Sequence, residues 1–164
     1  MKRLLILTLL LTGTAACNRA DGDNSAANAL DAQALNVAAG MQNRTAPPNG
    51  ATSWQTSANG LRYRRTRGDG SGPKPAANAI VTLHYVGTLE DGTVFDSSIE
   101  RGAPVTMALP DLIPAWQQGV PMMSTGDVYQ FVVPPELGYG AQGAGPIPPN
   151  ATLHFEIALL RIDS

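Results

Sequence analysis

The sequence predicts an α+β domain in which an antiparallel β-sheet curls over one short α-helix. Two observations predict this class. Stretches with strand patterning recur after residue 60 and are separated by turn residues, and one stretch between them carries the signals of a short helix. A helix this short needs the sheet to hold it, and a helix packed on an antiparallel sheet is an α+β arrangement.

Four stretches of the chain are expected to form strands. The first begins after Gly60 and ends in turn residues. The second holds two strands, because the dipeptide Asp91-Gly92 in its middle favours a tight hairpin turn. The expected stretches are 60–70, 79–98, 127–133 and 151–162.

The last stretch has the clearest strand pattern. Large apolar residues occupy every second position from Leu153 to Leu159, and the residues between them, beginning with His154, are polar or small. Period two indicates a strand with one buried face. His84 is out of phase with the apolar residues of its strand in the same way, so both histidines are expected on the surface or on a sheet face, away from any pocket, and not to form a metal pair.

The single helix is expected in IPAWQQGV, residues 113–120. Pro114 suits the first helical position and Gly119 suits the position just past the end. Trp116 shares a face with the apolar residues one turn away on either side, so this face should pack on the sheet.

The N-terminus has the residue order of a secretory signal. Lys2 and Arg3 precede an apolar run from Leu4 to Leu11, and small residues follow. The run is too short to span a bilayer comfortably, because spanning takes about 20 apolar residues. Residues 1–16 are therefore predicted to be a cleaved signal peptide.

Cys17 is the only cysteine and follows this segment directly. The arrangement resembles a bacterial lipoprotein, in which this cysteine is lipidated and acyl chains contribute about 0.8 kcal/mol per buried CH₂. Thr14 departs from the usual leucine, so a secreted protein cut after Ala16 is the alternative. The expected location is the bacterial envelope. Asn18 favours the outer membrane, with the domain facing the periplasm, and an unlipidated chain would be periplasmic.

Residues 17–57 are predicted to be a disordered tether, lipidated at its start. They contain few large apolar residues and bury too little to offset the entropy of ordering. A coil of about 40 residues would span on the order of 35 Å, using about 5–6 Å × √n. The net charge of −2 gives no electrostatic footprint for nucleic acid, so no nucleic-acid partner is expected.

Four arginines cluster in the first expected strand. The simplest interpretation is a solvated strand, and the alternative is contact with an anionic membrane surface. The residues are Arg62, Arg64, Arg65 and Arg67.

Three motifs carry a resemblance to a known family. They are VTLHYVGTLEDGTVFDSS (81–98), IPAWQQGV (113–120) and PPELGYGAQGAGPIPPNATLHFEI (134–157). In this order and spacing they resemble the FKBP-type (immunophilin) peptidyl-prolyl cis-trans isomerases. The resemblance implies that residues 58–164 form a half-barrel-like antiparallel sheet around one short helix, with a pocket between the two.

The resemblance also assigns pocket residues by motif. Catalytic roles are implied for Tyr85, Phe95, Asp96 and Tyr139. Substrate contacts are implied for Met107, Leu112, Ile113, Trp116, Ile147 and Phe155.

Some of these residues have simpler interpretations. Asp96 would orient Tyr85, or would only bond local backbone N–H groups at the end of a hairpin. Tyr139 would point its hydroxyl at a bound peptide, or would only anchor the glycine- and proline-rich loop. Trp116 would form the floor under a proline ring, and core packing is compatible with that role.

The implied activity is rotation about X–Pro bonds of proline-containing polypeptides, which assists protein folding in the envelope. No cofactor or metal is expected, macrolide inhibitors are possible ligands, and a monomer is favoured because the N-terminal segment is too short for a long dimerising helix. A non-catalytic chaperone module that binds proline segments and is tethered to the membrane is the alternative. A lipid-tethered surface-interaction protein is a third.

The sequence departs from the family pattern at a few positions. Val105 stands where well-known members carry phenylalanine, and the segment that follows it is shorter. Ala144 replaces a larger loop residue seen in some members. These changes bear on substrate preference and macrolide affinity more than on activity. Arg65 and Thr66 stand where relatives often place apolar residues, which predicts a bulged or edge first strand.

Overall fold

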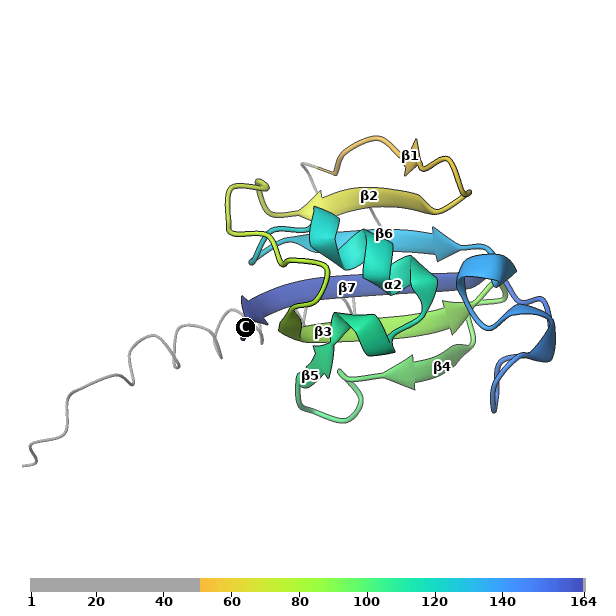
Figure 1. Cartoon of the computed structure of the whole chain (residues 1–164). Helices are drawn as coiled ribbons and strands as arrows, with labels where there is room; N and C mark the ends of the chain where they lie inside the picture. Colours follow the sequence, from red (N-terminus) through yellow and green to blue (C-terminus); the bar gives the residue numbers. More distant parts are fainter. Residues whose placement is uncertain (1–50, 164) are drawn as a thin grey trace, which may run out of the picture.

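The computed structural model describes residues 51–163 (Figure 1). The predicted signal peptide, Cys17 and the tether up to residue 50 lie outside the described residues. Within 51–163 no helix is both long enough and apolar enough to cross a membrane.

The described part of the chain forms one antiparallel sheet of seven strands. The strands are β1 (Gln55–Thr56), β2 (Arg62–Arg67), β3 (Ile80–Leu89), β4 (Val94–Ser97), β5 (Val105–Ala108), β6 (Val128–Val133) and β7 (Leu153–Ile162). Their order across the sheet is β1-β2-β6-β7-β3-β4, and β5 also pairs with β3. The predicted α+β class and all of the expected strands are confirmed.

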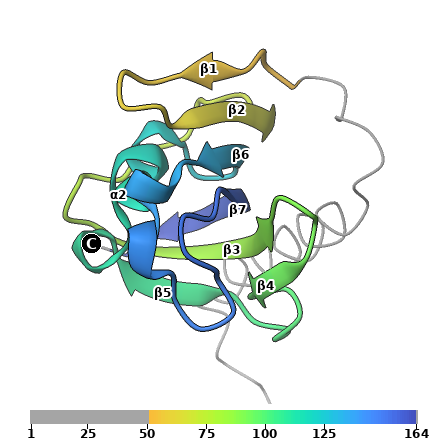
Figure 2. The same ribbon diagram turned by 90° about the vertical axis from the view of Figure 1, so that its right-hand side faces the viewer.

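The one α-helix among residues 51–163, α2 (Pro114–Gly119), lies across one face of this sheet (Figure 1). Viewed from the side, the sheet and the helix form two layers (Figure 2). Pro114 occupies the first turn and Ile113 before it is extended, so the helix begins where the sequence predicted. Gly119 allows a close approach, because a Cβ there would lie 2.5 Å from Cε1 of Phe131 on β6.

Four short 3₁₀ turns complete the described chain. They are η1 (Leu109–Asp111), η2 (Val120–Met122), η3 (Pro135–Leu137) and η4 (Gly140–Gln142). The first two flank α2, and the last two lie in the loop between β6 and β7.

The core fills the space between helix and sheet. The alternation predicted for β7 is confirmed: Leu153, Ile157 and Leu159 are fully buried in it. Trp116 on the helix belongs to the same core cluster and contacts the ring of Phe155 on β7. Burying a side chain of this size contributes about 1.5–3 kcal/mol, so the sheet holds a helix too short to be stable alone.

The opposite face of the sheet carries residues of the other parity. His84 is buried there, and its Nδ1 lies 2.9 Å from Oγ of Ser98. Because its side chain lies on the face away from the helix, its predicted direction is confirmed.

The structure adds two strands to those predicted from the sequence, and it contains the predicted bulge. β1 and β5 were not predicted, and β1 lies inside the range 17–57 that the sequence assigned to the tether. The register between β2 and β6 shifts between Arg65 and Arg67, which is the bulge expected around Thr66.

Candidate active site

A hollow of about 240 Å³ opens between α2 and the sheet. All predicted pocket residues except Ile147 line it, together with Asp111. The lining residues are Tyr85, Phe95, Asp96, Met107, Asp111, Leu112, Ile113, Trp116, Tyr139 and Phe155.

These residues come from six elements and the loops next to them. Tyr85 on β3 and Phe155 on β7 point to the helix side because of strand parity. Phe95 and Asp96 are consecutive on β4, at the sheet edge, where both side chains reach the hollow. Trp116 reaches the hollow from α2, opposite the sheet.

Gly87 on β3 is a residue that the sequence analysis missed. It pairs with both Asp96 of β4 and Phe155 of β7. A Cβ at this position would lie 2.6 Å from Cζ of Phe95 and 2.9 Å from Cε1 of Phe155. The absent side chain therefore leaves room for the two rings. A glycine in the middle of a strand pattern is the signal that could have found it.

The base of the hollow is built from perpendicular aromatic rings. Trp116 meets Tyr85 edge to face with centroids 5.1 Å apart, and it meets Phe155 at 5.3 Å. Phe95 meets Phe155 at 5.6 Å. Edge-to-face pairs contribute about 0.5–1.5 kcal/mol beyond their buried area, so the walls are held in fixed orientations.

One side of the hollow is polar. The Tyr85 hydroxyl donates a short hydrogen bond to Oδ2 of Asp96. Arg101 forms an ion pair with the other Asp96 oxygen, and its Nη2 donates to the Tyr85 oxygen over 2.8 Å. These contacts place Asp96 against the Tyr85 hydroxyl, which is the arrangement that the predicted orienting role requires. Arg101 was missed, because it lies outside the motif and only the fold of the loop after β4 brings it back.

The three groups of this network shift one another's pKa values. Burial, and then the hydrogen bond to Asp96, raise the pKa of Tyr85, so its hydroxyl stays protonated. Burial alone would raise the pKa of Asp96, but hydrogen bonds from Tyr85 and Arg101 outweigh it and lower that pKa. The hydrogen bonds to Asp96 and Tyr85 raise the pKa of Arg101. The polar side therefore carries a fixed carboxylate and a fixed guanidinium beside a neutral phenol.

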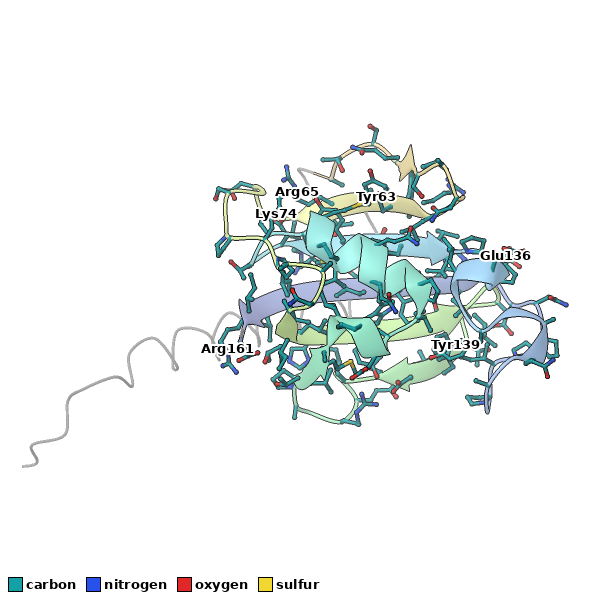
Figure 3. The ribbon with its side chains drawn as sticks, viewed as in Figure 1. Tyr63, Arg65, Lys74, Glu136, Tyr139 and Arg161 are labelled. Atoms are coloured by element: carbon teal, nitrogen blue, oxygen red, sulfur yellow. The ribbon has the colours of Figure 1, made fainter. Side chains whose placement is uncertain are left out.

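Tyr139 lies at the start of the loop after β6, at the rim of the hollow (Figure 3). The residue is 39% exposed, so a ligand in the hollow can reach it. Burial of part of the ring raises its pKa, with a smaller contribution from Asp96, and the hydroxyl remains a donor at neutral pH.

Ile147 lies elsewhere. Two backbone hydrogen bonds join it to Ala144, of 2.9 and 3.0 Å, and fold the loop back on itself. Its side chain is 6% exposed and packs into the core cluster beneath the loop. In this structure Ile147 supports the loop that carries Tyr139 and does not line the hollow.

Comparisons of the sequence and of the structure with known proteins both find peptidyl-prolyl cis-trans isomerases. The family model described as FKBP-type peptidyl-prolyl cis-trans isomerase matches residues 72–160. A protein of Aeromonas hydrophila named FKBP-type peptidyl-prolyl cis-trans isomerase FkpA is 47% identical over 109 residues. The match covers 66% of this chain and 40% of the relative.

Further relatives differ in how much of them is matched. The peptidyl-prolyl cis-trans isomerase Mip of Coxiella burnetii is 44% identical over 66% of this chain and 47% of its own length. FK506-binding protein 1 of Dictyostelium discoideum is 46% identical over 56% of this chain and 89% of its own length. The chain thus spans less than half of the FkpA and Mip relatives but most of the Dictyostelium one.

Solved structures agree with the fold. The crystal structure of a peptidyl-prolyl cis-trans isomerase from Pseudomonas syringae matches with a TM-score of 0.63 and 33% identity, over 87% of this chain and 99% of that one. That of FkpA from Escherichia coli matches with a TM-score of 0.64 and 34% identity, over 83% and 63%.

Proposed function

The chain belongs to the FKBP-type peptidyl-prolyl cis-trans isomerase family, and on this premise we propose that it catalyses rotation about X–Pro bonds in polypeptides. The observation that carries the proposal is the single hollow in which the predicted aromatic residues meet. Tyr85, Phe95, Trp116 and Phe155 converge there, beside one polar side.

The hollow suits a reaction that needs no bond to the enzyme. Rotation about a peptide bond is slow because twisting destroys amide resonance, at a cost of about 18–20 kcal/mol. Resonance places negative charge on the carbonyl oxygen, and water stabilises that planar, charge-separated form. An apolar hollow withholds this solvation and favours the twisted amide. Each ~1.4 kcal/mol of selective stabilisation raises the rate tenfold.

Named residues supply distinct parts of this environment. The indole of Trp116 would lie under the proline ring, since it forms the base of the hollow. The hydroxyl of Tyr139 would donate a hydrogen bond to the peptide, since a ligand in the hollow can reach this residue at the rim. Asp96, held by Tyr85 and Arg101, would provide a fixed polar contact that is complementary to the twisted geometry.

A protease-coupled assay with a proline-containing peptide tests the activity. Phe95→Ala should lower kcat/KM about tenfold or more, because it opens the hydrophobic wall to water. Val94→Ala is the matched control, since Val94 is the preceding residue on β4 and is exposed. A wild-type rate no faster than the blank, or equal losses in both variants, would contradict the proposal.

The same assay addresses the binding of inhibitors and the chaperone alternative. We propose that macrolides such as rapamycin compete for the hollow, so adding one should remove the catalysed rate. Tyr139→Phe and Asp96→Ala separate the two alternatives. An isomerase should lose its catalysed rate in these variants. A binding module without turnover would show no catalysed rate even in the wild type, and its protection of a refolding client would be unchanged in the variants.

We further propose that the protein assists folding in the bacterial envelope as a monomer held by a lipid on Cys17. The order of charged, apolar and small residues before Cys17 supports this location. Cys17→Ser should release the protein from the membrane fraction into the periplasmic fraction. Unchanged membrane association would rule out the lipid as its cause. Sedimentation of the unlipidated protein would test the monomer.

A further inference from the structure

We call the hollow between α2 and the sheet, which we propose binds proline, the proline site. We propose that the protein has a second binding site, for a phosphate-bearing ligand, in a separate hollow beside β2. The hollow encloses about 320 Å³. Its lining residues are Thr52, Gln55, Tyr63, Arg65, Lys74, Met122 and Tyr129. None of these residues lines the proline site.

The second site lies on the helix side of the sheet, toward the other edge. Figure 3 shows Tyr63, Arg65 and Lys74 close together near β2, and Tyr139 at the opposite corner of the molecule. A ligand could therefore occupy this hollow while a peptide occupies the other.

The lining carries two cations and no carboxylate. Within residues 51–163, ion pairs join Arg101 to Asp96 and Arg161 to Asp163, and neither Arg65 nor Lys74 takes part in one. The charge of two cations matches a phosphate group, which carries about −1.5 to −2 at neutral pH. A carboxylate would neutralise only one of them.

Arg65 is placed for a ligand and lacks a partner. It sits opposite Tyr129 in the β2–β6 ladder. Its Nε is buried without a hydrogen-bond partner in the described chain. Because this Nε is buried, a ligand in the hollow would be bound by the terminal nitrogens of the guanidinium, for which no hydrogen bond is found in the described chain. The planar guanidinium fork matches phosphate oxygens.

The backbone around the site is fixed. Gly70 lets the Arg65 side chain lie against the loop after β2, because a Cβ there would be 2.2 Å from Nη1. Lys74 stands between Pro73 and Pro75, and the Pro73 carbonyl accepts a hydrogen bond of 3.0 Å from Thr125. The lysine is exposed, so its ammonium is free to reach a ligand.

Two carboxylates lie near the hollow without lining it, and one of them acts on Arg65: the guanidinium makes a small contribution to the lowered pKa of Asp69. Asp127 is buried and accepts backbone hydrogen bonds from Gly70 and Ser124, of 3.1 and 3.0 Å. Asp69 accepts hydrogen bonds from Ser71 in its own turn. The hydroxyls of Tyr63 and Tyr129 complete the lining with groups that can donate to phosphate oxygens, whereas the Thr52 hydroxyl is bonded to the backbone of Arg65.

Titration of the full chain carrying Cys17→Ser, followed by amide NMR shifts, tests the site. The probes are inorganic phosphate and glycerol 3-phosphate, with chloride at equal ionic strength as reference. Saturable shifts are expected around Tyr63, Arg65, Lys74 and Tyr129. Lys74→Gln and Arg65→Gln should each weaken binding about tenfold, which is about 1.4 kcal/mol. Shifts that do not saturate, or that chloride reproduces, would overturn the site.

Matched variants separate the site from general charge attraction. Arg62→Gln removes the same charge from the opposite face of β2, and Arg161→Gln removes it from the far end of β7. Both should bind phosphate within about twofold of wild type. Equal weakening in all four variants would overturn the proposal. Lys74 is exposed, so its variant remains informative even if Arg65→Gln fails to fold.

Vesicles identify the source of the phosphate. The same Cys17→Ser chain is sedimented with vesicles of phosphatidylcholine alone and with added phosphatidic acid, whose headgroup is a phosphate monoester like that of glycerol 3-phosphate. Binding to the anionic vesicles that is lost in Lys74→Gln but kept in Arg62→Gln assigns a lipid headgroup. Saturable binding of glycerol 3-phosphate without vesicle binding assigns a soluble phosphate ester. Failure in both arms would refute the site.

Discussion

At the scale of single residues, the polar side of the hollow between α2 and the sheet depends on an arginine that no motif marks. The residues of the hollow that sit inside the motifs were predictable, since Tyr85 and Asp96 belong to one contiguous stretch. Arg101 was not, because its role depends on how the loop after β4 folds back to reach them. A guanidinium has no local pattern that distinguishes this place from any other surface position.

Replacing Arg101 should move the acid limb of the activity profile. The arginine helps to lower the pKa of Asp96, so its loss raises that pKa toward the ordinary value. In Arg101→Gln, Asp96 then becomes protonated at a higher pH, and kcat/KM should begin to fall at a higher pH than in wild type. Steady-state assays across acid pH measure this. Arg161→Gln, which breaks the exposed pair with Asp163, is the control and should leave the profile unchanged.

His84 should make stability depend on pH. Burial lowers its pKa below the ordinary value of about 6.5, so the neutral form is favoured in the folded state. The contribution of neutral His84 to the free energy of unfolding is fully present above about pH 6.5. It is lost as the pH falls toward the lowered pKa of the folded state, because the unfolded state takes up the proton first. The thermal midpoint of wild type should therefore fall more steeply from pH 7.5 to 5 than that of His84→Gln. Parallel curves for the two proteins would contradict this.

At the scale of elements, strands in which apolar residues alternate with polar ones were predictable from the sequence. Short strands that form only by pairing with a neighbouring strand were not. Apolar residues alternate in β7 from Leu153 to Leu159, and burial alternates with them as far as Ile157, after which Ala158 is buried as well. β5 is four residues long and owes its existence to pairing with β3, where Met107 lies opposite Val81. β1 has two residues and exists only as a partner of β2. Short strands of this kind carry too few residues for a period to be read.

Gly87 makes a prediction at this scale, because it sets how closely β3 approaches two rings. Gly87→Ala would place a methyl group within 3 Å of Phe95 and Phe155. Overpacking of this kind costs about 1–3 kcal/mol, and the displaced Phe95 should also reshape the hollow. Chemical denaturation and the proline-peptide assay should both show a loss. Thr88→Ser, a change of one methyl group on the opposite face of β3, should affect activity within about twofold. Wild-type activity in Gly87→Ala would show that the rings adapt.

At the scale of the whole molecule, the sheet is organised around its last strand. β7 lies between β6 and β3, and the figures show this final segment in the middle of the sheet (Figure 1). The patterns of the individual strands do not specify this order, because pairing between distant segments has no local signal. Because the last strand lies at the centre of the sheet, many native contacts join residues that are far apart in the chain. Contacts of this kind slow folding.

Removing β7 should therefore abolish folding, whereas trimming its end should not. A chain ending at Thr152 leaves β1-β2-β6 and β3-β4-β5 without the strand that joins them. It also loses the buried side chains of Leu153, Ile157 and Leu159, each contributing about 1.5–3 kcal/mol against a total stability of about 5–15 kcal/mol. Calorimetry should find no cooperative transition in this chain. A chain ending at Leu160 keeps every pair between β6 and β7, so it should still unfold cooperatively at a lower temperature than wild type. A cooperative transition in the shorter chain would show that the two halves of the sheet associate without their central strand.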